Sequence, residues 1–242
     1  MRPADLGRIL FATSFAALGG LLLAAHGFGD VWPTIPKWMP ARDVLTMLSG
    51  IVLLVGGIGA LVPRGAPVSA MVLAGFMSFE LLVLKLPHIV AHPLLMGVYE
   101  DGAETLACLG GAWTIIAMLH DAAPVQRRPG RIAFGLALIP FGLAHFIYLD
   151  LTAPLIPAWL PFHVALAYGT GAAYVAAGLA ILSGVQARLA ATLTAVMVSL
   201  FTLIIWVPAI VSAPGKLGNW SELLISAAIT GAAWAVAQSY KK

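Results

Sequence analysis

The chain has 242 residues, of which 61% are apolar and only 10% are charged. A soluble domain carries about a quarter charged residues, so this composition excludes a water-soluble globular protein and favours a lipid bilayer as the solvent. The 13 basic residues form no basic stripe, which argues against nucleic-acid binding, and the single Cys108 excludes an internal disulfide.

Long apolar runs predict eight transmembrane helices and therefore an all-α integral membrane protein. The first run follows Arg2 and Arg8 and has small residues near Ala24, as a signal peptide does. Because its Gly-Arg-Ile motif at 7–9 is echoed at 130–132, where the fifth run begins, we expect a retained helix. The predicted spans are roughly 8–28, 43–62, 66–86, 102–120, 131–149, 163–184, 187–207 and 221–239.

Rigid residues recur along the chain at one fixed offset, since Pro154 lies 121 positions after Pro33. The other matches include Pro36/Pro157, Trp38/Trp159, Pro40/Pro161, Gly50/Gly171, Pro87/Pro208, Pro93/Pro214 and Gly110/Gly231. The pattern predicts a first four-helix repeat at 1–121, a cytoplasmic linker at 122–130 and a second repeat at 131–242. Four spans return the chain to the same side, so we expect two parallel repeats related by a pseudo-two-fold axis along the membrane normal.

Basic residues gather at one set of helix ends. Nine Lys and Arg residues lie there with two acids, whereas the other set of ends carries four basic and eight acidic residues. Lys and Arg collect on the cytoplasmic side of a membrane protein. We therefore predict a multi-pass membrane protein with both termini in the cytoplasm and the acids at the extracytoplasmic end. The expected location is the bacterial inner membrane.

Glu80 is the first candidate site residue. It lies seven residues before Pro87, where we expect the helix to end or kink, and so about 10 Å below the outer end. An acid at that depth is a functional-site hypothesis, and we predict Glu80 and His88 as catalytic residues that move protons. The alternative is that Glu80 pairs with Lys85 or a histidine and only holds two helices together.

His88 and His92 are spaced four residues apart. On one continuous helix their imidazoles would share a face, which suits a metal ion. Pro87 and Pro93 bracket them, so the alternative is a pair of interfacial histidines bonded to backbone carbonyls that the prolines leave free.

Other polar side chains of the outer half are predicted to bind a ligand. His163, Thr170 and Tyr174 fall on one face of the sixth helix, where they either line a pocket or form hydrogen bonds across a helix interface. The predicted ligand-binding set is Lys85, His26, Arg42, His145, His163 and Tyr174.

The second repeat carries motifs that can be compared with a known family. It reads His145, then Pro157-Ala-Trp-Leu-Pro161, Ala167-Tyr-Gly-Thr-Gly171 and Val207-Pro-Ala-Ile-Val211. This pattern resembles the DoxX-like family of four-helix membrane proteins, in tandem duplication. Two positions depart from the family pattern, because Tyr174 lies near a place where the family often has Glu, and Ile210 replaces the Asn of its Pro-Ala-Asn turn.

The resemblance implies an accessory or quinone-facing subunit of a membrane redox complex, because the family includes a membrane subunit of a thiosulfate:quinone oxidoreductase. Quinone is then the expected cofactor class, and haem b is not expected. Two other functions stay open: binding or transport of a small anion or lipid-like molecule without chemistry, and a structural or assembly role. The expected partners are the lipid bilayer and redox-complex subunits. Whether the chain is an enzyme, and whether it forms a homo-oligomer, stay open.

Overall fold

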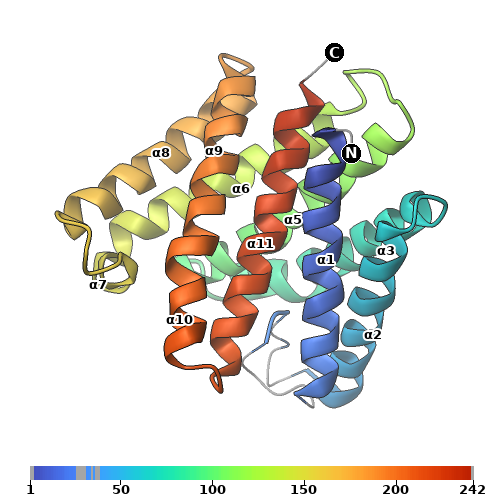
Figure 1. Ribbon diagram of the computed structural model, residues 1–242, viewed down its shortest axis with the longest axis horizontal. Coiled ribbons are helices and arrows are strands. Elements are labelled where there is room, and N and C mark those ends of the chain that lie inside the picture. The colour runs from blue at the N-terminus through green and yellow to red at the C-terminus, as the bar shows by residue number, and fades with distance from the viewer. Residues whose placement is uncertain (1–2, 26–30, 34, 36–38, 241–242) are drawn as a thin grey trace.

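The computed structural model describes residues 3–25, 31–33, 35 and 39–240. Every regular element in this part of the chain is a helix, and eight helices are long and apolar enough to cross a membrane (Figure 1). The prediction of an all-helical chain with eight such helices is confirmed. The first residues of α1 and the last residues of α11 lie at the same end of the bundle (Figure 1).

The described elements divide between the two halves of the chain. The first half comprises α1 (Pro3–Ala24), α2 (Arg42–Leu61), α3 (Ala66–Phe79), the π-helix η1 (Glu80–Lys85), α4 (Leu86–Ala91) and α5 (Met96–Leu119). The second half comprises α6 (Arg128–Ile147), α7 (Leu149–Thr152), the 3₁₀ helix η2 (Ala153–Leu155), α8 (His163–Ser183), α9 (Ala187–Phe201), the π-helix η3 (Thr202–Trp206), α10 (Val207–Ser212) and α11 (Leu217–Ser239).

α5 begins at Met96 and not near residue 102 as predicted. The first N–H groups of a helix have no partner inside it, and here a neighbouring segment supplies one, because the Gly97 N–H donates to the Tyr148 hydroxyl at 3.1 Å. The Tyr99 hydroxyl in turn donates to the Pro93 carbonyl at 3.1 Å. The longer helix places two acids predicted to lie outside it, Glu100 and Asp101, on its second turn.

Pro87 and Pro208 do not end their helices, so of the two outcomes expected for Pro87, an end or a kink, the end is wrong. Each lies within the first turn of a short α-helix, α4 or α10, that directly follows a π-helical segment. Proline lacks an N–H and its ring clashes with the carbonyl four residues earlier. A π turn removes this conflict because its hydrogen bonds span five residues. It also places residues five apart on the same side of the helix.

α5 and α11 form the centre of the bundle. They are the two most buried of the long helices, and they contact each other. Each also packs against the first helix of the other half, α5 against α6 and α11 against α1 (Figure 1). Within each half the first helix packs on the second, α1 on α2 and α6 on α8.

Glycines permit these helices to approach closely. A Cβ atom placed on Gly19 of α1 would lie 2.3 Å from the Leu54 backbone nitrogen of α2. In the second half, a Cβ on Gly142 of α6 would lie 2.6 Å from the Gly171 carbonyl oxygen of α8. Small residues at such crossings stabilise membrane helix pairs through backbone contact.

The adjacent glycines of α1 provide a matched test of this packing. We expect Gly19→Ala to lower the free energy of unfolding by about 1–3 kcal/mol, because the added methyl group overlaps the α2 backbone. Gly20→Ala should leave it unchanged or slightly higher, since a Cβ there meets no atom within 4 Å. Thermal unfolding of the two variants in one detergent measures the difference, and equal midpoints would contradict the packing.

Large apolar side chains cover the outside of the bundle. Val55 of α2, Val68 of α3, Leu179 of α8 and Leu193 of α9 are all exposed. Soluble monomers rarely expose continuous apolar surface of this kind. This surface suits lipid, as the composition predicts.

Candidate functional site

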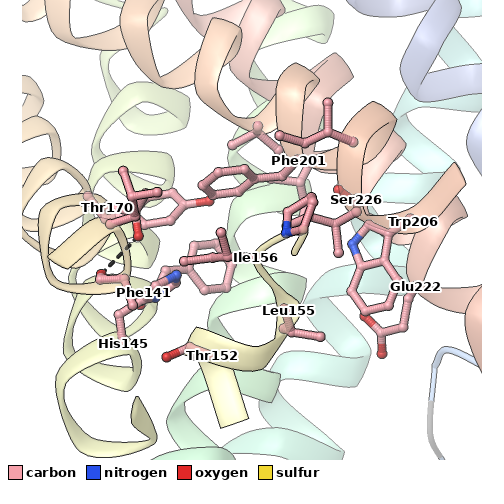
Figure 2. Close-up of a pocket in the computed structure, with 18 of the residues that line it drawn as sticks. Phe141, His145, Thr152, Leu155, Ile156, Thr170, Phe201, Trp206, Glu222 and Ser226 are labelled. Atoms are coloured by element: carbon pink, nitrogen blue, oxygen red, sulfur yellow. Dashed lines mark hydrogen bonds between the residues drawn. The ribbon is translucent and has the colours of Figure 1, made fainter. Parts of the chain in front are cut away.

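A cavity of about 280 Å³ lies in the second half of the protein. Its walls come from α5, α6, α8, α9, η3 and α11, and the segment around η2 closes one side. His145 and Phe141 lie on one side of it and Trp206 and Glu222 on the other (Figure 2). Since the lining residues extend from the loop after η2 into the middle of α8, the cavity reaches well into the bundle.

Most of the cavity wall is apolar. Phe141, Ile156 and Phe201 contribute large side chains, and Trp206 adds an indole. Phe201 and Trp206 are five residues apart across η3, so the π turn brings both rings to the same side. Pockets for small organic ligands combine such walls with a few well-placed polar groups.

Tyr174 is the most buried polar group of the wall. Its side chain is 6% exposed, and its ring packs against His145 at 5.6 Å and Phe141 at 5.8 Å between ring centroids. Its hydroxyl makes no hydrogen bond with any residue in the described part of the chain. A buried Tyr hydroxyl usually has a partner, so Tyr174 presents an unused donor and acceptor to the cavity.

His145 has a defined tautomer. Its Nδ1 lies 2.7 Å from the Phe141 carbonyl oxygen. A carbonyl oxygen can only accept, so Nδ1 carries a hydrogen. In the neutral ring Nε2 is then an acceptor, and none of the described residues donates to it.

Three carboxylates line the same cavity. Glu100 and Glu104 come from α5 and Glu222 from α11. None of the three forms an ion pair or a hydrogen bond with another described residue. The described residues that line the cavity include neither Lys nor Arg. They are absent from the predicted ligand-binding set, although the spacing Glu100-x-x-x-Glu104, which puts both acids on one helix face, could have identified them.

The structure brings together only part of the predicted ligand-binding set. His145 and Tyr174 line the cavity, with Thr170 beside them. His163 does not; it lies on a separate shallow depression beside the first turn of α8. Arg42 is also elsewhere, where its Nε donates to the Ile35 carbonyl at 2.9 Å. His26 falls outside the described residues.

Glu80 and Lys85 lie in the first half and do not line this cavity. Both are buried, and Lys85 pairs with Asp101. The alternative that Glu80 pairs with Lys85 is therefore not the arrangement present, because the Lys85 ammonium contacts Asp101 instead. His88, the other predicted catalytic residue, is half-buried on α4 and is not part of the cavity lining.

His88 and His92 do lie side by side. The helix continues through Pro87 to Ala91, and the two ring centroids are 5.0 Å apart. The described residues include no group of three or more His, Cys, Asp or Glu side chains placed to hold a metal ion. A zinc site needs at least three protein ligands, so these two imidazoles do not make one by themselves.

The predicted repeat aligns Leu18 and Leu22 with Phe141 and His145, at the offset of 123 positions that also relates 7–9 to 130–132, and Leu53 with Tyr174 at the offset of 121. All three leucines are fully buried. Trp32 is also buried, at 4% exposed. At the positions that the predicted repeat aligns, the first half therefore has packed leucines, whereas the second half has cavity-lining residues.

Comparisons with protein-family models, with curated proteins and with solved structures found no match to this chain. The eight apolar helices and the cavity therefore carry the functional inference.

Proposed function

We propose that this chain is a quinone-binding, multi-pass protein of the bacterial inner membrane, acting as an accessory or quinone-facing subunit of a membrane redox complex. The observation that carries the proposal is an apolar, aromatic cavity among apolar helices, whose lining includes the adjacent rings of His145, with a free Nε2, and Tyr174, with an unpaired hydroxyl. This is the function that the resemblance to the DoxX-like family also implies.

A quinone ring suits these groups in both of its states. The Tyr174 hydroxyl can donate to a quinone carbonyl, and His145 Nε2 can accept from a quinol hydroxyl. Phe141, Phe201 and Trp206 offer ring faces for stacking or edge contacts with the quinone ring. Glu104 lies in the same cavity, where a carboxylate can accept a proton from a bound quinol.

The carboxylates argue against one of the alternatives. A small anion in this cavity would meet Glu100, Glu104 and Glu222 with no basic side chain on the described lining. No described group on this lining can pair with an anionic charge, and a buried charge without a partner is costly. An anionic ligand is therefore the class that the cavity favours least.

Quinone binding can be tested directly. The full-length protein in lipid nanodiscs is titrated with a short-chain benzoquinone, and quenching of tryptophan fluorescence reports occupancy because Trp206 lines the cavity. Loss of one hydrogen bond in Tyr174→Phe should weaken binding by about 3- to 10-fold. His163→Gln, outside the cavity, serves as the control. Absence of saturable quenching, or equal affinities in both variants, would refute the proposal.

A lipophilic organic cation is the second candidate ligand. Three carboxylates without a basic partner on an aromatic wall are the groups that recognise such ions. Glu104→Gln combined with Glu222→Gln should then abolish binding of tetraphenylphosphonium, whereas quinone affinity should change little. Binding of tetraphenylphosphonium without binding of quinone would identify lipophilic cations as the ligand class.

We also propose that the halves are parallel repeats related by a pseudo-two-fold axis along the membrane normal. In support, α3 starts at Ala66 and α9 at Ala187, 121 positions later, and α4 and α10 follow their π-helices at the same offset. The last helix of each half packs on the first helix of the other half, α5 on α6 and α11 on α1. A two-fold axis relates these two contacts to each other. The excess of basic residues at the ends that hold both termini supports a cytoplasmic location for them.

A further inference from the structure

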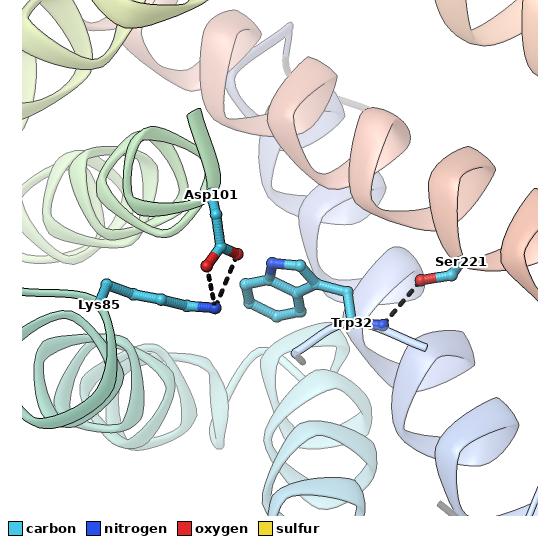
Figure 3. Close-up of polar contacts among 4 residues, drawn as sticks. All are labelled: Trp32, Lys85, Asp101 and Ser221. Carbon is cyan, nitrogen blue, oxygen red and sulfur yellow. Dashed lines mark hydrogen bonds and ion pairs between the residues drawn. The ribbon is translucent and has the colours of Figure 1, made fainter. Parts of the chain in front are cut away.

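A second polar group, apart from the cavity, is buried in the first half between η1, α5 and the segment after α1 (Figure 3). Glu80 is 0% exposed, and neither of its carboxylate oxygens has a hydrogen-bond partner among the described residues. Lys85 is 2% exposed, and its Nζ lies 2.7 and 2.9 Å from the two carboxylate oxygens of Asp101. The indole of Trp32 lies beside this ion pair (Figure 3).

The charges of this group do not balance if Glu80 is ionised. Lys85 and Asp101 neutralise each other in a two-pronged ion pair. An ionised Glu80 would then leave one unpaired negative charge inside an apolar helix bundle, which costs several kcal/mol. A carboxylate in this place needs a positive charge of its own, either a proton or a cation.

The surrounding helices do not supply that charge. From α5, Asp101 pairs with Lys85, Glu104 lies within electrostatic range of that pair, and Cys108 lies within electrostatic range of Glu80. α3 and α4 pack against η1, and the described residues include no Lys or Arg on either. His88 of α4 is titratable, but it forms no hydrogen bond with Glu80. Trp32 offers an indole N–H that has no partner in the described part of the chain. Lys85 is therefore the one described cation facing Glu80.

The π-helix places Lys85 within reach of two acids. Glu80 and Lys85 are the first and last residues of η1, and a π turn brings residues five apart to the same side. Both side chains consequently point into the bundle. The flexible four-carbon stem of lysine can then move its ammonium between Asp101 and Glu80.

We propose that Glu80 is a proton-binding site in the interior of the bundle, and that the Lys85 ammonium moves from Asp101 toward Glu80 when that proton leaves. In the protonated state Glu80 is a neutral acid and Lys85 pairs with Asp101, which is the arrangement present. In the deprotonated state Lys85 is shared by two carboxylates. The proton leaves Glu80 for water beside Asp101, whose side chain is 30% exposed.

This site does not depend on which ligand occupies the cavity. It lies close to it, however, because Asp101 and Glu104 are three residues apart on α5 and Glu104 lines the cavity. A change of charge at Glu80 and Asp101 would therefore be felt by a ligand beside Glu104.

Infrared spectroscopy of the full-length protein in nanodiscs tests the proton site. The wild type at neutral pH should show the carbonyl band of protonated carboxylic acids, with a shift in D₂O. Glu80→Gln should remove the part of that band contributed by one carboxyl group, and it should fold normally because an amide replaces a neutral acid of the same shape. The control Asp43→Asn removes an acid outside both polar groups and should leave the band unchanged. An unchanged band in Glu80→Gln would overturn the proposal.

A second variant tests the movement of Lys85. In Asp101→Asn, Lys85 loses its partner and becomes free to pair with Glu80, so Glu80 should ionise at neutral pH and its share of the band should disappear. The double variant with Glu80→Gln should then show the same band as Asp101→Asn alone. Retention of the Glu80 signal in Asp101→Asn would show that Lys85 does not change partners.

Discussion

Lys85→Met is expected to destabilise the protein by about 3 kcal/mol, the lower end of the range for breaking a buried ion pair. The substitution keeps the volume of the side chain but leaves Asp101 without its partner at 2.7 Å. The lower end applies because Asp101 is 30% exposed and can partly recover hydration. Thermal or denaturant unfolding in one detergent, compared with the wild type, measures the loss.

Two further variants separate the ion pair from the lysine side chain itself. Lys216→Met removes an exposed lysine from the loop before α11 and should leave stability within about 0.5 kcal/mol of the wild type. The double variant Lys85→Met/Asp101→Leu should recover most of the lost stability, because an apolar pair can replace a buried ion pair at little cost. If Lys85→Met unfolds like Lys216→Met, the buried pair does not stabilise the fold.

Filling the cavity is expected to have the largest effect on ligand binding. Ala167 is buried on α8 and lines the cavity, so the ring in Ala167→Phe would occupy part of its 280 Å³. Since a misfit of a single methylene costs 1–3 kcal/mol, we expect the affinity for a short-chain benzoquinone to fall by about 100-fold or more. Quenching of tryptophan fluorescence in nanodiscs measures the affinity.

The same substitution on the outside of α8 is the matched control. Ala173 is exposed on that helix, and Ala173→Phe should bind the quinone like the wild type. Unfolding of both variants must be measured alongside binding, so that a loss of affinity is not confused with a loss of fold. Equal affinities in two folded variants would place the ligand outside the cavity.

Helical periodicity predicted some residues of the cavity but not its extent. Helical periodicity predicts that Thr170 and Tyr174 share a face, and both line the cavity. The same face includes His163, which lies outside it. Periodicity gives the direction of a side chain around a helix axis, but the cavity occupies only part of the length of α8, and that extent depends on how α8 packs against α6 and α9.

For Glu80 and Glu104, the surroundings of each side chain could not be predicted from helical periodicity. The depth of Glu80 in an apolar run marked it as a candidate, yet its surroundings depend on η1, and the π turn results from the conflict between Pro87 and the preceding carbonyl within a packed helix. Glu104 was predicted only as one of eight acids at the outer helix ends. Its place in the cavity follows from the position of α5 at the centre of the bundle, between the two halves.

The sequence by itself determined the helical class and the number of long apolar helices, because the length and apolar content of each run decide whether it can cross a bilayer. Only the tertiary structure decided that His145 and Tyr174 line one cavity together with three glutamates. It also decided that Lys85 pairs with Asp101, so that Glu80 has no hydrogen-bond partner among the described residues. Those contacts join helices far apart in the chain, and their geometry depends on close glycine crossings and π turns. The residue pattern of one helix does not contain that information.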